Sequence, residues 1–423
     1  MKFTAMKQTG KKGERDKRLI EAVIRRFAPI SRVGIHQVTN LRRTTISQIT
    51  RELLEEGRLL EVGRSNNPLG RKQILLQLNP KFGYIIGIEF DDEVVAAGVM
   101  DLAPNLLHLI HEPADLKHGM DGLLSQLQFC VMRAIRESKI DPALLLGIGI
   151  ADPGLVDSRR GITLTSSTID FWQQAPLKKL FEEKFGIATT VESKTRAKTI
   201  AERILGSGKM QDNLIYVDYG AGIGAGVVVD GLLLYGHNCG VGELGHIHIS
   251  NNGPACRCGS IGCLEAMAGT AAIEARIRQA LTEGAGSQVV ARVGGDSSRI
   301  TAWDVFSAAR AGDKMCGNIV TELGDNLGIA IAKMVNLFNP SIVVFDKRLE
   351  LAGDALLEQI GRIVRAQALA SSTENLTLTL GTLGEEVGIL GIGLAVLEKH
   401  FELPERRFVD EVPEPDQPVL AHS

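Results

Sequence analysis

The sequence predicts an α/β body of two lobes, preceded by a small basic domain that contains a helix-turn-helix. Three observations support this. Strand-like and helix-like apolar patterns alternate after residue 80. The first 57 residues read as three helices. Residues 1–80 hold 17 Lys and Arg against 7 Asp and Glu, whereas the remaining residues hold 30 against 43. A basic first part on an acidic body indicates a polyanionic partner.

The composition excludes several classes of protein. A chain of 423 residues with 44% hydrophobic residues is long enough for two or three domains with their own cores. It contains no run of eighteen apolar residues and no N-terminal signal core, so we expect a cytoplasmic protein without membrane insertion. Its six cysteines suit a reducing compartment better than a disulfide scaffold. Three of them (Cys130, Cys239 and Cys316) are expected to be plain core or surface thiols.

Three helices are expected in the basic part. Apolar residues at helical spacing predict the first over Leu19–Phe27. Ser31 can cap a second over Arg32–Thr39, and a third runs over about Arg42–Glu56 and ends at Gly57. Two short helices around a tight turn are typical of the helix-turn-helix motif.

The outer face of the third helix has the chemistry of DNA recognition. Its hydrogen-bonding side chains are Arg42, Arg43, Thr44, Thr45, Ser47, Gln48 and Arg51. Two strand-like runs follow, Leu59–Gly63 and Gln73–Leu78, and the tip between them carries Arg64, Arg71 and Lys72. A hairpin with a basic tip is a wing, whose cations contact phosphates. We therefore predict binding to double-stranded operator DNA; the alternative is a solvated basic segment.

The rest of the chain alternates between strands and helices. The expected strands are Tyr84–Phe90, Val94–Met100, Leu145–Ile150, Thr189–Glu192, Leu214–Asp218, Gly226–Val229 and Ile342–Phe345. The expected helices are Leu123–Glu137, Leu177–Phe185, Thr270–Leu281, Ala302–Ala311, Asn318–Phe338 and Gly388–Phe401. Residues 284–300 are predicted to be a surface loop, and residues 401–423 a disordered tail.

One imidazole and three thiols lie within eighteen residues: His246, Cys256, Cys258 and Cys263. Four such ligands are what a closed tetrahedral zinc site requires. The alternative is a set of buried cysteines beside a core histidine. Gly259 and Gly262 favour the metal, because they let the chain double back between the second and third cysteines. We predict structural zinc.

The segment Gly242–His246, the cysteines after it and the glycine-rich run Asp218–Gly226 before it resemble the signature of the ROK family of bacterial repressors and sugar kinases. The resemblance extends over residues 84–400. It implies an actin-like, ribonuclease H-like sugar-kinase fold for residues 81–400, and a winged helix-turn-helix domain for residues 1–80.

Comparison with the family pattern also implies that the chain is not an enzyme, because residues that the kinases need are replaced. The family's catalytic aspartate corresponds to Lys194, and a protonated lysine cannot act as a base. Asp91 and Glu93 replace the glycine and threonine of the first phosphate loop. The late glycine pair of the kinases is Phe345–Asp346 here. Only the second glycine loop remains, and we expect it to serve as a tight turn between strands.

By the same resemblance, Glu243, His246 and Glu265 would hold sugar hydroxyls. The position of a further family asparagine is Thr168. Lys194 is a candidate for the ligand site, where it either reads an anionic group or pairs with a nearby acid such as Glu243.

These observations predict a transcriptional regulator, most simply a repressor, that senses a sugar or sugar derivative. Two heads on a homodimer, or on a dimer of dimers, would match a palindromic operator. The alternatives are a DNA-binding dimer without a ligand, a bifunctional sugar kinase, and a regulator released by a protein partner.

Overall fold

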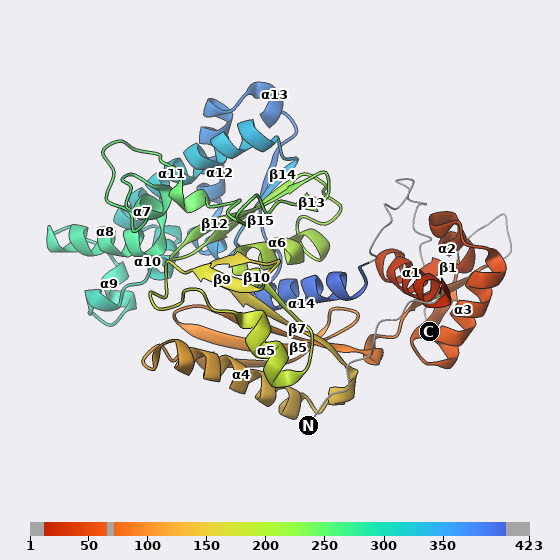
Figure 1. Ribbon diagram of the computed structural model, residues 1–423. Helices are drawn as coiled ribbons and strands as arrows, with labels where there is room; N and C mark the ends of the chain where they lie inside the picture. Colours follow the sequence, from red (N-terminus) through yellow and green to blue (C-terminus); the bar gives the residue numbers. More distant parts are fainter. Residues whose placement is uncertain (1–11, 66–71, 403–423) are drawn as a thin grey trace.

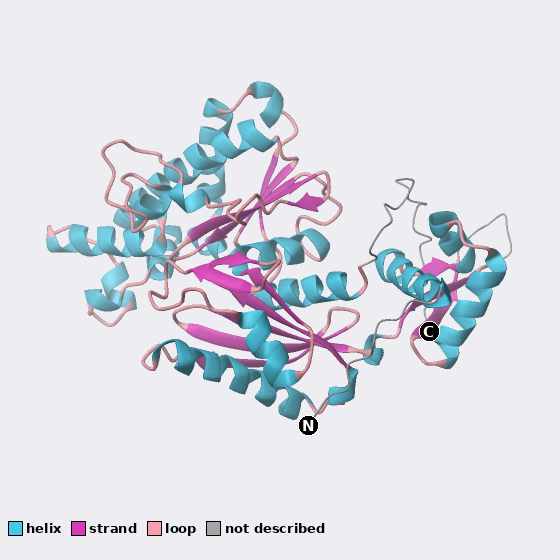
Figure 2. Ribbon diagram, viewed as in Figure 1, coloured by secondary structure: helices cyan, strands magenta, loops and turns pink. Residues whose placement is uncertain are grey.

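The computed structural model describes residues 12–65 and 72–402. The first three helices and strands form a small N-terminal unit that lies at one end of the molecule in Figure 1. The remaining elements form two lobes, each built on a five-stranded sheet, with helices between and around them (Figure 2). Within the described residues, no helix is both long and apolar enough to cross a membrane.

The N-terminal unit packs three helices on a small sheet. Its helices are α1 (Lys12–Phe27), α2 (Arg32–Thr39) and α3 (Arg43–Glu55), and its strands are β1 (Ile30–Ser31), β2 (Leu59–Arg64) and β3 (Ile74–Leu78). The sheet order β1-β3-β2 places the predicted hairpin beside a short strand that the sequence did not indicate. A core of fully buried apolar side chains joins the helices: Ile20, Ile24, Ile35, Ile46 and Leu53.

The two helices of the predicted helix-turn-helix, α2 and α3, differ in their N-terminal caps. The Ser31 hydroxyl accepts a hydrogen bond from the Gly34 amide at 3.1 Å, as expected for a cap of α2. Asn40 ends α2 in the left-handed conformation and starts the tight turn expected between the two helices. Arg42 occupies the N-cap of α3 without a side-chain hydrogen bond, so the first amides of α3 have no side-chain cap.

Lobe one is built on a mixed sheet in the order β10-β7-β4-β5-β6. The strands are β4 (Tyr84–Phe90), β5 (Val94–Asp101), β6 (Leu106–Pro113), β7 (Leu145–Asp152) and β10 (Thr189–Ser193). One face packs on α4 (Gly119–Ser138) and α5 (Leu177–Phe185), and a short ribbon of β8 (Leu155–Asp157) and β9 (Ile162–Thr165) lies at one end. The other face packs on α14 (Val387–His400). Gly87 permits this approach, because a Cβ there would lie 2.8 Å from the Ile389 carbonyl oxygen.

Lobe two is built on a sheet in the order β13-β12-β11-β14-β15. The strands are β11 (Leu214–Tyr219), β12 (Ile223–Val229), β13 (Leu232–Leu233), β14 (Ile342–Phe345) and β15 (Thr377–Leu380). The helices of this lobe are α7 (Leu264–Ala268), α8 (Thr270–Thr282), α9 (Val289–Arg292), α10 (Ala302–Arg310), α11 (Lys314–Phe338), α12 (Asp354–Gln367) and α13 (Ala370–Thr373).

Two helices lie between the sheets. Helix α6 (Lys194–Ile204) packs along α14, and Figure 1 shows both between lobe one and lobe two. Gly391 allows the close approach, since a Cβ there would lie 1.8 Å from the Ala197 carbonyl oxygen. Helix α6 also contacts β11 and β12 of lobe two. Its side chains therefore reach both lobes.

Several elements differ from the sequence predictions. Helices α6 and α12 and strands β6 and β15 were not predicted. The prediction of a loop over residues 284–300 is wrong in part: this segment contains α9 and a 3-10 turn, Ser297–Arg299, and Val289 is fully buried. The predicted tail lies almost wholly outside the described residues. Cys130, Cys239 and Cys316 are buried free thiols, as expected.

Candidate metal centre and ligand cleft

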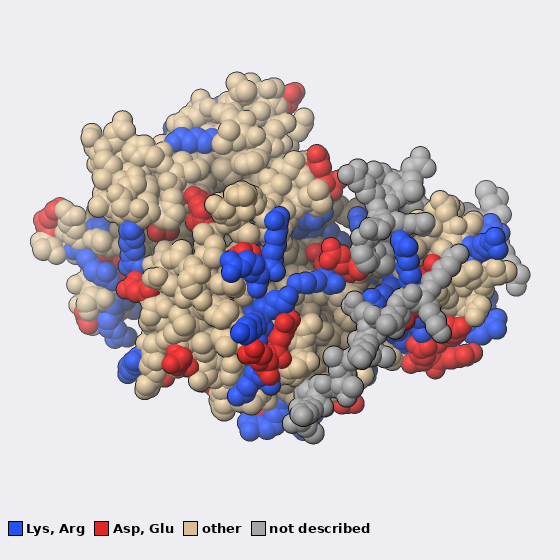
Figure 3. All heavy atoms as spheres, viewed as in Figure 1, with Lys and Arg blue, Asp and Glu red and all other residues tan. Residues whose placement is uncertain are grey.

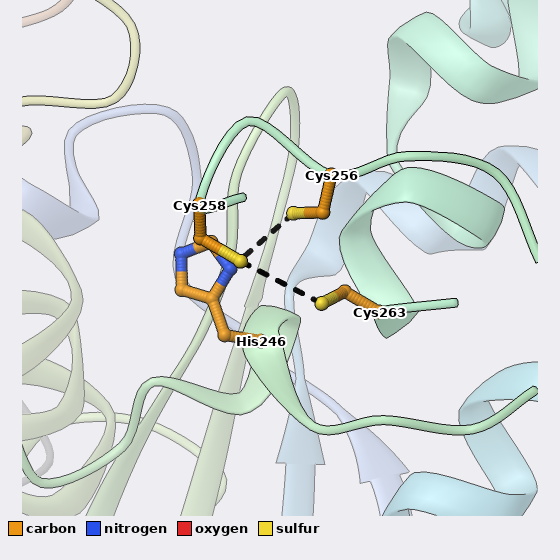
Figure 4. A group of neighbouring side chains, drawn as sticks. All are labelled: His246, Cys256, Cys258 and Cys263. Atoms are coloured by element: carbon orange, nitrogen blue, oxygen red, sulfur yellow. Dashed lines mark hydrogen bonds between the residues drawn. The ribbon is translucent and has the colours of Figure 1, made fainter. Parts of the chain in front are cut away.

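The four predicted metal ligands come together in lobe two. His246 ends a 3-10 turn (Leu244–His246), Cys263 is the N-cap of α7, and the other two cysteines lie on the loop between them. All four ligand atoms lie within 4.8 Å of one another. Figure 4 shows the three sulfurs and the imidazole facing a common centre.

The distances fit a tetrahedral metal. Metal–sulfur and metal–nitrogen bonds of about 2.3 and 2.0 Å place two sulfurs about 3.8 Å apart, and a sulfur about 3.5 Å from a nitrogen. The Cys258 and Cys263 sulfurs are 3.7 Å apart, and the Cys256 sulfur is 3.6 Å from His246 Nδ1. The first distance is far too long for a disulfide. These residues can hold a metal ion, with His246 Nδ1 as its nitrogen ligand.

Glycines let the loop turn, as the sequence indicated. Gly259 and Gly262 both have positive φ, 90° and 63°. A Cβ on Gly262 would also lie 1.7 Å from the Ser250 carbonyl oxygen. The Cys256 amide donates to the Ser260 carbonyl oxygen at 2.8 Å, which closes the turn around Cys258. Backbone hydrogen bonds and the two glycine turns thus bring the cysteines together.

Two predicted ligand-binding carboxylates precede and follow the cysteine and histidine cluster in the chain. Glu265 lies in the first turn of α7 and accepts a hydrogen bond from the Ile223 amide at 3.3 Å. Glu243 is the residue before the 3-10 turn, and within residues 12–65 and 72–402 its carboxylate accepts no hydrogen bond. Burial raises the pKa of Glu243, and the nearby His246 and Arg196 only partly oppose this.

Lys194 opens α6, and its ammonium contacts Asp91 Oδ2 at 3.0 Å. Its partner is therefore Asp91 of lobe one rather than the suggested Glu243. Asp91 Oδ1 also accepts the amides of Glu93 and Val94, both at 3.0 Å. Burial opposes ionisation of Asp91, but Lys194 and these amides outweigh it and hold the pKa of this carboxyl below its ordinary value.

A second cluster of charges lies one turn further along α6. The buried Lys198 ammonium contacts Asp218 Oδ1 at 2.7 Å and Asp346 Oδ2 at 3.3 Å. Arg348 binds Asp346 through Nε at 3.0 Å. Burial opposes ionisation of Asp346, but Lys198 and Arg348 outweigh it and lower the pKa of that carboxyl well below its ordinary value. The Thr195 hydroxyl donates to Asp218 Oδ2 at 3.1 Å.

The glycine loop of lobe two makes internal contacts. The Tyr219 carbonyl oxygen accepts a 2.6 Å hydrogen bond from Arg348, whose guanidinium stacks 4.8 Å over the Trp303 ring. A Cβ on Gly226 would lie 1.7 Å from the Thr199 hydroxyl of α6. At least this glycine serves strand–helix packing, in line with the structural role expected for the loop.

The comparisons with known proteins agree with this architecture. A profile of the ROK family matches residues 85–399. The chain belongs to the ROK family. It is 29% identical to the xylose repressor of Caldicellulosiruptor bescii, over 89% of this chain and 94% of that protein. It is 30% identical to the DNA-binding transcriptional dual regulator NagC of Escherichia coli K12, over 87% of this chain and 88% of the relative.

Two solved ROK structures differ in how much of this chain they cover. A ROK transcriptional regulator, a homologue of the E. coli MLC protein, covers 92% of this chain and 97% of its own with a TM-score of 0.79 and 27% identity. A ROK glucokinase from Streptomyces griseus, solved with glucose and AMPPNP, covers 74% of this chain and 99% of its own with a TM-score of 0.66 and 25% identity. The predicted family and its sugar-kinase-like α/β fold are therefore confirmed.

Sequence reasoning missed Arg196, a buried cation close to Glu243. This buried guanidinium binds Glu192 Oε1 at 2.5 Å and the carbonyl oxygens of Cys239 and Val156 at 2.8 and 3.1 Å. It also stacks 5.2 Å over the Tyr235 ring. Arg196 thereby fixes the loop that leads into Glu243. No local pattern indicated this pair, because Glu192 lies in strand β10 and Arg196 in the first turn of α6, so the pair forms across a strand–helix junction.

The predicted DNA-contacting residues lie on the surface of the N-terminal unit. Six of the seven on α3 and its cap are exposed: Arg42, Arg43, Thr44, Ser47, Gln48 and Arg51. Thr45 is half-buried, and exposed Gln48 donates to Glu52. Arg64 and Lys72 are exposed, whereas Arg71 lies outside the described residues. Figure 3 shows basic side chains at the outer edge of this unit and acidic ones at its lower edge.

Proposed function

We propose that this chain is a DNA-binding transcriptional repressor whose body senses a sugar and transfers no phosphate. The observation that carries the proposal is the extent of the structural likeness. The regulator covers 92% of the chain, whereas the glucokinase covers 74%. We assign DNA binding to the N-terminal part, residues 1–80, and ligand binding to residues 81–400.

The charges in the cleft support a body without kinase activity. A sugar kinase requires a base for the attacking hydroxyl and cations for the nucleotide phosphates. Lys194 stands where the family has its base, and Asp91 holds it in an ion pair. Lys198 already binds the carboxylates of Asp218 and Asp346, and Arg348 binds Asp346. A nucleotide triphosphate would have to displace these carboxylates from their cations, and their negative charge would repel it.

We propose that the cysteine and histidine cluster holds structural zinc. Three thiolates and one imidazole suit zinc in a closed site, and the recorded distances agree with its tetrahedral geometry. Glu243 and Glu265 precede and follow the cluster in the chain, so a metal there would fix both carboxylates. Such a brace would stabilise the ligand cleft as well as the fold.

A route from the cleft to the N-terminal unit runs through α14. This helix packs along α6, which carries Lys194, Arg196 and Lys198. Phe401 follows its end, and the Arg25 guanidinium of α1 lies 5.8 Å from the centre of the Phe401 ring. Closure of the lobes around a ligand would shift α14 and with it the N-terminal unit. In a homodimer this movement would change the distance between two recognition helices and weaken operator binding.

A gel-shift experiment tests the proposal. The purified chain is titrated against the DNA upstream of its own gene, with and without a panel of sugars. We expect a retarded complex that Arg43→Ala weakens and that one or more sugars dissociate. ATP consumption with the same sugars should stay at background. A retarded complex that no sugar affects would favour a DNA-binding dimer without an effector, and sugar-dependent ATP consumption would favour a kinase.

A further inference from the structure

The N-terminal unit joins the body through a short linker that is bonded on both sides. The linker is Asn79–Gly83, between β3 and β4. The Asn79 side chain donates to the Gly57 carbonyl oxygen of the unit at 2.8 Å. The Pro80 carbonyl oxygen accepts the Leu102 amide of lobe one at 3.1 Å. The linker is thus fixed to both parts, unlike a flexible tether, whose backbone stays solvated.

Arg58 of the unit makes the central contact with the body. Its guanidinium binds the buried carboxylate of Glu21 in α1 at 2.8 Å. The same group lies 5.2 Å from the centre of the Phe82 ring, in cation–π contact. Phe82 in turn packs on the apolar cluster of lobe one and α14. One side chain therefore connects a core helix of the unit to the body.

The end of α14 completes this contact. The Arg25 guanidinium of α1 lies 5.8 Å from the centre of the Phe401 ring, and Figure 1 shows the C-terminal end of α14 directed at α1. Glu21 and Arg58 of the unit, with Phe82 and Phe401 of the body, line a cavity of only about 30 Å³. Surfaces that pack this closely transmit displacements from one to the other.

We infer that Arg58 is a positioning residue that holds the N-terminal unit rigidly on the end of α14, so that the unit turns with this helix. The joint consists of Arg58, Phe82, Phe401 and the linker. Rigid docking at the joint depends only on these contacts. The turning of the unit in response to a ligand rests on the proposed sugar-responsive function.

Digestion of the full chain with a lysine-specific protease tests the docking. Lys81 is an exposed residue of the linker, within the 3-10 turn Pro80–Phe82. Cleavage after Lys81 requires this turn to open, so its rate reports how often the joint opens. We expect Arg58→Met to release the fragment that begins at Phe82 at least about tenfold faster, which corresponds to about 1.4 kcal/mol.

Arg32→Met is the matched control. The Arg32 side chain is 30% exposed, against 28% for Arg58, and it binds Glu61 and Thr50 inside the unit. We expect this variant to be cleaved after Lys81 at the rate of the unaltered chain. Equal cleavage rates in the two variants would overturn the inference.

A second variant separates undocking of the unit from its unfolding. Lys17 lies in α1, so cleavage there reports unfolding of the unit itself. Phe401→Leu leaves the Glu21–Arg58 ion pair in place, and we expect it to speed cleavage after Lys81 about threefold without affecting Lys17. If Phe401→Leu leaves cleavage after Lys81 unchanged, or speeds both cleavages alike, the joint does not hold the unit and the inference is wrong.

Operator binding with and without glucose, N-acetylglucosamine or xylose tests the turning of the unit. We expect at least one sugar to weaken binding by the unaltered chain, and the ratio of the two affinities to fall toward one in Arg58→Met. A merely structural role would weaken both affinities and leave their ratio unchanged, which would overturn the coupling. If no sugar acts on the unaltered chain, the proposed function and the coupling fail, while the cleavage rates still decide the docking.

Discussion

Replacement of Lys198 by methionine tests the charge cluster that joins α6 to lobe two. Lys198 is 5% exposed, and its ammonium contacts both Asp218 and Asp346. Methionine keeps the apolar length of the side chain but leaves two buried carboxylates without this cation. Loss of one partner from a buried ion pair costs about 3–5 kcal/mol of unfolding free energy.

The remaining contacts place the expected cost near the lower limit. Asp346 keeps Arg348, and Asp218 keeps the Thr195 hydroxyl. We therefore expect Lys198→Met to lower the free energy of unfolding of lobe two by about 3 kcal/mol at pH 7.

Lys194→Met is the matched control, one helical turn away. The side chains of its ion pair are 19% and 36% exposed, and Asp91 keeps two amide donors. An ion pair of this kind contributes about 1 kcal/mol or less.

The pH dependence gives a second readout. Lys198 and Arg348, against the effect of burial, hold the pKa of Asp346 well below its ordinary value. A carboxylate with a depressed pKa stabilises the fold above its unfolded pKa of about 3.9, and this stability is lost as pH falls. The cost of Lys198→Met should thus stay constant from neutral pH down to about 4 and should shrink at lower pH, where Asp346 takes up a proton.

Urea unfolding followed by tryptophan fluorescence measures the effect. The chain has only two tryptophans, Trp172 in lobe one and Trp303 in lobe two. In a shared Trp172→Phe background, the signal comes from Trp303, over which Arg348 stacks. Equal shifts of the unfolding midpoint for Lys198→Met and Lys194→Met, or a cost that does not change with pH, would refute the reasoning.

Three further predictions concern the other parts of the chain. Cys258→Ser should abolish stoichiometric zinc in the purified protein, measured by elemental analysis, whereas Cys130→Ala should retain it; zinc retained in both would contradict the assigned ligands. Arg43→Ala should cost about 1–3 kcal/mol of operator binding if it reads a base, whereas Lys72→Ala should weaken all sequences alike and reduce the slope of log affinity against log salt by about 0.9. Ile20→Ala should cost about 2–5 kcal/mol in the core of the N-terminal unit, with loss of the gel shift but normal zinc content; an unchanged gel shift would argue against the assigned DNA-binding unit.

Short-range features were largely predictable from the sequence. Apolar spacing located α1 and α3, and the Ser31 cap located the start of α2. The metal cluster was predictable because its four ligands and two turn glycines lie within eighteen residues. Such features depend on local periodicity, capping and turns, which adjacent residues encode.

Strand β6 and helix α6 show where this local information fails. The polar residues of Leu106–Pro113 include two histidines and interrupt a clean alternation. Helix α6 is buried along most of its length, and its buried residues include Arg196, Lys198 and Glu202. A buried helix with charged side chains lacks the amphipathic pattern from which helices are predicted.

The sequence by itself determined the family signature and singled out the four residues of the cysteine and histidine cluster. Only the tertiary structure decided which charges pair around α6. Asp91 and Lys194 are 103 residues apart, and Lys198 and Asp346 are 148 apart. A lysine in the sequence can meet many acids, and its partner depends on how two sheets pack around α6. Ion pairing depends on distance in space, which the packing of distant elements sets and local sequence does not encode.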